Sequence, residues 1–80
     1  MNGPRRTASP RPVAVRVGDT GVPVAVGGLV VEGVLEDWLV EDRWWSGRPL
    51  RRRYFELVTT DGRCITVFRD LGGGWHMQRD

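Results

Sequence analysis

Residues 52–70, RRYFELVTTDGRCITVFRD, decide the fold predicted for this chain. Apolar and polar side chains alternate on both sides of Asp61-Gly62, which is the pattern of two β-strands. Asp-Gly is the dipeptide that a two-residue type I′ turn favours, because both of its central residues need positive φ. The segment is therefore predicted to be a β-hairpin closed at Asp61-Gly62.

A two-residue turn would also fix the register of this hairpin. It would pair Val58 with Ile65 and would bring Phe55 across from Phe68, an aromatic pair worth a few tenths to ~1 kcal/mol. The face expected in the core then holds Phe55, Leu57, Thr59, Cys64, Thr66 and Phe68. In that position Cys64 would be a buried, unreactive thiol.

Further strands are predicted outside the hairpin, where apolar runs alternate between glycine-containing turns. They cover residues 13–17, 22–26, 29–35, 38–45 and 75–77. Gly72-Gly73-Gly74 lacks the lysine and the following helix of a nucleotide-binding loop, so it is predicted to be a turn. No segment has a helical period. The predicted fold is all-β, a small antiparallel meander of about six strands that forms a curved sheet or a partly open barrel.

The chain is long enough for one domain, because it has 80 residues. Residues 1–12 hold three prolines and few apolar side chains, so they are predicted to be a flexible arm ahead of a single β domain at residues 13–80. No apolar run approaches the ~20 residues that cross a bilayer, and no apolar stretch follows the early arginines as in a signal peptide. The one cysteine, Cys64, excludes an intramolecular disulfide. The expected location is the cytoplasm, with no membrane partner.

Catalytic and metal sites are not expected. Cys64 and His76 are the only cysteine and histidine, too few for a structural zinc site with its four ligands. A nucleophile also needs a base within reach and a group that orients the base. Glu41 and Asp42 are adjacent in a predicted strand, so their carboxylates point to opposite faces and cannot share a proton or a metal. The sequence therefore predicts a protein that is not an enzyme, with no catalytic residue, no metal and no cofactor.

Charge is arranged in blocks. All twelve basic residues are arginine, and the net charge is +2. The acidic block contains Glu32, Glu36, Asp37, Glu41 and Asp42. The basic block that follows contains Arg43, Arg48, Arg51, Arg52 and Arg53. Such segregation indicates either an interaction surface or neighbouring strands that pair acid against base within the fold.

The candidate binding residues combine arginine with aromatic rings. They are Arg43, Trp44, Trp45, Arg48, Arg51, Arg52, Arg53 and Tyr54. Guanidinium groups bind phosphates, and exposed rings stack on unpaired bases at roughly 1–3 kcal/mol per base. Alternation places Trp44 and Trp45 on opposite faces, so at least one of them is expected in the core. Contact with a protein, contact with nucleic acid and a purely structural role all remain open at this point.

The second half of the chain also resembles a known family. The resemblance rests on the paired Trp44 and Trp45, on Arg51–Tyr54, on the hairpin closed at Asp61-Gly62, and on Trp75. With these residues the segment resembles the C-terminal segment of ImuB-type proteins, inactive relatives of Y-family DNA polymerases that act in bacterial damage-induced mutagenesis. The chain is similar also to short standalone actinobacterial proteins of unknown function.

What the resemblance implies is a non-catalytic accessory or adaptor module that docks a polymerase-like partner of the translesion-synthesis (DNA damage tolerance) machinery. One alternative is a module that binds single-stranded or primer-template DNA. Another is a small structural domain without a separate partner. An unpaired edge strand in so small a sheet is also compatible with a homodimer.

Overall fold

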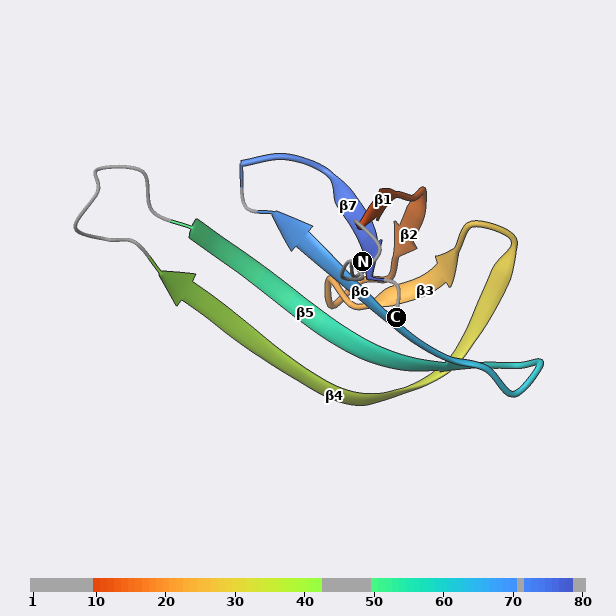
Figure 1. Ribbon diagram of the computed structural model, residues 1–80. Coiled ribbons are helices and arrows are strands. Elements are labelled where there is room, and N and C mark those ends of the chain that lie inside the picture. The colour runs from red at the N-terminus through yellow and green to blue at the C-terminus, as the bar shows by residue number, and fades with distance from the viewer. Residues whose placement is uncertain (1–9, 43–49, 71, 79–80) are drawn as a thin grey trace, which may run out of the picture.

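The computed structural model describes residues 10–42, 50–70 and 72–78 (Figure 1). These residues form strands β1 (Arg11–Pro12), β2 (Val15–Val17), β3 (Pro23–Val26), β4 (Leu29–Asp42), β5 (Leu50–Thr59), β6 (Cys64–Asp70) and β7 (Trp75–Gln78). The predicted all-β fold is confirmed. No described segment is a helix long and apolar enough to span a membrane.

The strands form one antiparallel sheet in the order β1-β7-β6-β5-β4-β3-β2. β1 and β2 stand at opposite ends of this order although only Val13 and Ala14 separate them in the sequence. The Val13 N–H donates to the Trp75 carbonyl at 3.1 Å, and the Gly27 N–H donates to the Ala14 carbonyl at 2.7 Å. One short segment therefore bonds to both ends of the meander, and the sheet curls into a half-barrel (Figure 1).

β1 changes the predicted domain boundary. Arg11 and Pro12, which the sequence places in the arm, pair with Met77 and His76 of β7. Pro12 is tolerated there because β1 is an edge strand, where a missing N–H leaves no ladder bond broken. The ordered sheet thus begins before Val13.

β4 is a single strand of 14 residues where the sequence predicts two strands. The pairing of β4 with β5 shifts register between Val31 and Gly33 and again between Val34 and Glu36. A bulge of this kind accepts an extra residue and bends the strand without ending it. The predicted boundary between residues 35 and 38 is therefore absent, and β4 continues through two register shifts as one strand.

The central hairpin has a longer turn than predicted. The Gly62 N–H donates to the Thr59 carbonyl at 2.9 Å, and the Thr59 N–H donates to the Arg63 carbonyl at 2.9 Å. With Val58 paired to Cys64, Thr59 faces Arg63 across three residues, whereas a type I′ turn has two. The last of the three, Gly62, has a φ of 87°. The turn is therefore a three-residue loop, Thr60–Gly62, that ends in a glycine bulge.

This loop shifts the register of β6 by one residue and reverses its faces. Phe55 pairs with Val67 and Tyr54 pairs with Phe68, so the predicted pairing of Phe55 with Phe68 is wrong. Cys64 is exposed, so its predicted burial is wrong as well. The turn predicted after β6 is present, since the Gly73 N–H donates to the Asp70 carbonyl at 2.8 Å.

The core fills the inside of the curl. Its buried centre consists of Val26, Phe55, Leu57 and Val67. Around it pack the partly buried Val13, Val15, Val22, Val31, Ile65, Trp75 and Met77. Each buried side chain of this size contributes about 1.5–3 kcal/mol, so a few residues stabilise the whole sheet.

Candidate partner-binding site

The predicted site residues divide between described and undescribed parts of the chain. Arg43, Trp44, Trp45 and Arg48 lie outside the described residues. Arg51, Arg52, Arg53 and Tyr54 lie near the start of β5, opposite the end of β4. β4 and β5 pair from Val31 and Thr59 to Asp42 and Leu50, while β6 reaches only to Arg52. The paired strands β4 and β5 are called here the β4–β5 ribbon, and the end of this ribbon at Asp42 and Leu50 extends past β6 (Figure 1).

The arginines of β5 alternate between the two faces of this ribbon. Arg51 and Arg53 share their face with Phe55 and line an open groove of about 390 Å³. Leu39, Arg69 and Trp75 line it too, together with Thr20-Gly21 from the turn between β2 and β3. The rings of Phe55 and Trp75 lie 5.8 Å apart between centroids. The groove thus combines an aromatic floor with guanidinium groups.

The acids of β4 neutralise two of these arginines. Arg51 Nε lies 2.7 Å from Glu41 Oε2, and Arg53 Nη2 lies 3.2 Å from Asp37 Oδ2. Both pairs are about half exposed, so each is worth only about 0.2–1 kcal/mol. They nevertheless occupy the groups that would bind a phosphate. The charge blocks were open to two interpretations, an interaction surface or pairing within the fold. These two pairs fit the second, in which acids and bases of neighbouring strands pair with each other.

Arg69 is the third arginine of the groove. It lies directly across from Arg53 in the pairing of β5 with β6. Within the described residues, the ion pairs involve Arg51, Arg52, Arg53 and Arg63, and none involves Arg69. The groove therefore carries more positive than negative charge among its described side chains.

The opposite face of the ribbon carries a row of four rings, one from each of four neighbouring strands. The row is Trp38, Tyr54, Phe68 and His76. Successive ring centroids lie 5.3, 5.0 and 5.3 Å apart, and the first pair is parallel to within 5°. The two outer pairs are stacked, with Trp38 on Tyr54 and Phe68 on His76, whereas Tyr54 and Phe68 are tilted by 34°.

Arg52 closes over this row. Its guanidinium carbon lies 4.6 Å from the centroid of Phe68, which is only 1% exposed. Its Nε is buried and has no hydrogen-bond partner among the described residues; Asp70 Oδ2 is 3.8 Å away. This position makes Arg52 part of the packing of the sheet.

Most of this ring row is not predicted from the sequence. A two-residue turn places Phe68 on the core face, and Tyr54 then has no ring neighbour on β6. The signal for the row in the sequence is a pair of rings, Trp38 and Tyr54, in two strands with alternating side chains. The three-residue turn adds the third ring, because it brings Phe68 opposite Tyr54.

β4 is exposed on both of its faces. Every residue from Val34 to Leu39 is exposed, including Leu35 at 56% and Leu39 at 49%. Clustered exposed apolar side chains of this kind are typical of sites that bind another molecule.

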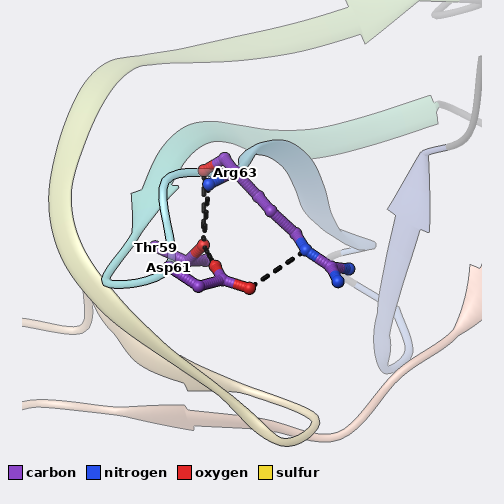
Figure 2. A network of polar contacts seen from close by, with 3 residues as sticks. All are labelled: Thr59, Asp61 and Arg63. Atoms are coloured by element: carbon purple, nitrogen blue, oxygen red, sulfur yellow. Dashed lines mark hydrogen bonds and ion pairs between the residues drawn. The ribbon is translucent and has the colours of Figure 1, made fainter.

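The tip of the hairpin holds a separate polar network, which Figure 2 shows. The Thr59 hydroxyl donates to the Asp61 carboxylate and accepts a bond from the Arg63 N–H at 3.2 Å. Arg63 Nε lies 3.0 Å from Asp61 Oδ2. The hydroxyl bond, aided by Arg63, lowers the pKa of Asp61. Thr59 and Arg63 flank the loop and Asp61 lies within it, so the network holds the loop in place.

A Cys64–His76 dyad is not formed. Cys64 pairs with Val58, and His76 pairs with Phe68. Cys64 and Phe68 are four positions apart on β6, so the thiol lies about 13 Å along the strand from the histidine. The described residues contain no group of three or more His, Cys, Asp or Glu side chains that could hold a metal ion.

The described chain thus presents one candidate site, the β4–β5 ribbon, with a charged groove on one face, a ring row on the other, and exposed apolar side chains along β4. Comparisons with protein-family models, with curated proteins and with solved structures give no match to this chain.

Proposed function

We propose that this domain is a non-catalytic adaptor that docks a partner protein through the β4–β5 ribbon. The observation that carries the proposal is the exposed run from Val34 to Leu39, in which Leu35 and Leu39 expose about half of their side chains. Covering such side chains returns roughly 25 cal/mol per Å² of apolar surface. A protein surface supplies this cover, whereas a nucleic-acid backbone does not.

The groove arginines and the rings also favour a protein partner over DNA. A phosphate approaching Arg51 or Arg53 would compete with Glu41 or Asp37. An unpaired base stacks on an exposed ring face, but the rings of Tyr54 and Phe68 stack on their neighbours. Direct binding of single-stranded DNA is the second candidate function, and Arg69 beside the Phe55 and Trp75 rings is the feature that favours it.

The resemblance to the C-terminal segment of ImuB-type proteins supports a partner from the damage-tolerance machinery. On this basis the partner is a polymerase-like protein of translesion synthesis. The domain would then act by holding that protein, since docking needs no chemistry from the ribbon.

Binding of the full chain to a Y-family polymerase relative from the same genome tests the proposal. Leu35→Ser should weaken binding about tenfold or more, because a covered leucine contributes about 1.5–3 kcal/mol. Val24→Ser is the matched control: Val24 is 42% exposed on β3, outside the exposed run from Val34 to Leu39, and its replacement should leave affinity unchanged. Equal affinities for both variants would contradict docking through β4.

A salt series with a single-stranded oligonucleotide tests the second candidate function. DNA binding would weaken with salt by roughly 0.7 in log K for each phosphate neutralised. A double replacement, Arg51→Ala with Arg69→Ala, would reduce that slope. Arg52 stays unchanged because it covers Phe68. Tight, salt-sensitive DNA binding that Leu35→Ser does not alter would favour DNA as the ligand.

A further inference from the structure

Beyond Val30, one side of β4 has no paired strand among the described residues. β5 runs along β4 from Val31 to Asp42, whereas β3 pairs only with Leu29 and Val30. In Figure 1, β4 forms the outer rim of the ribbon. Along this rim, alternate backbone N–H and C=O groups point away from β5, as they do on any edge strand.

Part of this rim is regular enough to accept another strand. Both register shifts of β4 fall before Glu36, and the pairing then continues without interruption from Glu36–Glu56 to Asp42–Leu50. This stretch is about 23 Å long at 3.3 Å per residue, the length of an ordinary β-strand. Bulges protect an edge against pairing, so their absence here leaves residues 36–42 open.

The side chains along this stretch define the partner's chemistry. On the ring face Glu36 precedes Trp38 and Val40, and on the groove face Asp37 and Glu41 flank Leu39. Glu36 faces Glu56 directly across the ladder, and neither is in an ion pair among the described residues. Two like charges in this position destabilise the ladder until a cation joins them. A basic side chain on an added strand would supply that cation.

We infer that the Glu36–Asp42 edge of β4 binds an extended segment of the partner protein by strand addition, and that this segment carries arginine or lysine beside apolar residues. The inference rests on the proposed docking function and specifies the partner's chemistry. A second copy of the chain is a poor occupant. β4 holds five acids and no base, so two copies joined along it would bring acids together with no base to pair them.

Amide hydrogen exchange of the full chain with a defined peptide tests the inference. The probe is a peptide of about seven residues, blocked at both ends, in which arginine alternates with valine; such main-chain addition is a known mode of peptide recognition. In the free protein, alternate amides between Glu36 and Glu41 should exchange fast, because they point to the open side. The peptide should slow those amides at least tenfold and leave the β5 amides unchanged.

Two modified peptides distinguish main-chain hydrogen bonding from electrostatic attraction between side chains. The same peptide with N-methyl groups at alternate positions cannot complete the ladder and should give no protection. A peptide with glutamate in place of arginine should bind at least tenfold more weakly. In the protein, Glu36→Gln should weaken binding several-fold, whereas Glu32→Gln, which lies at the first register shift, should not.

Three results would overturn the inference. Equal protection by the N-methylated peptide would mean that side chains alone hold the peptide. Protection that rises with protein concentration without peptide, with a dimer mass by light scattering, would mean that a second copy occupies the edge. If the peptide gives no protection but Leu35→Ser still weakens binding of the polymerase relative, only strand addition is contradicted. If Leu35→Ser has no effect on that binding either, docking through the ribbon is contradicted as well.

Discussion

Arg53 on β5 lies directly across from Arg69 on β6, and both side chains line the same groove. Like charges at facing positions of an antiparallel pair destabilise it by up to ~1 kcal/mol. Asp37 on the other side of Arg53 offsets this repulsion at 3.2 Å. The Arg53 side chain therefore has one attractive neighbour, Asp37, and one repulsive neighbour, Arg69.

Replacement of Arg69 by threonine should stabilise the domain. Arg69→Thr removes the repulsion and places a good strand-forming residue on β6, so the free energy of unfolding should rise by a few tenths to about 1 kcal/mol at low salt. The gain should shrink as salt screens the pair. Urea unfolding at low and high salt measures both effects. Arg63→Thr is the control, because Arg63 pairs with Asp61 and its loss should not stabilise; a destabilised Arg69→Thr would contradict the prediction.

The turn glycine offers a test of the backbone conformation of the hairpin loop. Gly62 has a φ of 87°, a conformation that an L residue adopts only at a cost. Gly62→Ala should therefore lower the free energy of unfolding by about 1 kcal/mol. Gly73 has no positive φ and nothing within 4 Å of an added Cβ, so Gly73→Ala should be neutral or slightly stabilising. Equal effects in thermal unfolding would argue against the left-handed conformation of Gly62.

The existence of the central hairpin could be predicted from its sequence, but its register could not. Alternation on both sides of Asp61-Gly62 identifies the two strands whatever the turn. The same dipeptide fits a two-residue turn or the end of a three-residue turn, and the choice between them moves Phe68 from one face to the other. The Thr59–Asp61–Arg63 network favours the longer loop, and it forms only once the chain has turned.

The candidate site was predictable in a similar, partial way. Alternation implies that Arg51 and Arg53 share a face and that Arg52 points to the other. The pairing of Arg51 with Glu41 and of Arg53 with Asp37 depends on which strand lies beside β5 and in which register. The local sequence does not specify this neighbour or this register, because the number of residues that connect β4 to β5 does not fix a register.

Cys64 reports directly on the face that β6 presents. It is exposed at the start of the strand, so a thiol reagent such as dithionitrobenzoate should label the folded domain nearly as fast as the urea-unfolded chain. The predicted core position would instead protect the thiol by orders of magnitude. Cys64→Ser should change the free energy of unfolding by less than ~0.5 kcal/mol, as for other exposed positions. Labelling that occurs only after global unfolding would contradict the observed register.

The Asp61 network should make stability depend on pH in the acid range. The hydroxyl of Thr59, with help from Arg63, lowers the pKa of Asp61 from its ordinary value of 3.8. Because the folded-state pKa is the lower one, this contribution is fully present above the unfolded-state pKa and disappears as pH falls through the folded-state value. Urea midpoints of the wild type and of Asp61→Asn, compared from about pH 6 down to pH 2, should differ by a constant amount above about pH 5 and converge below pH 4. A difference that does not change with pH would show that the Asp61 charge has no part in holding the turn.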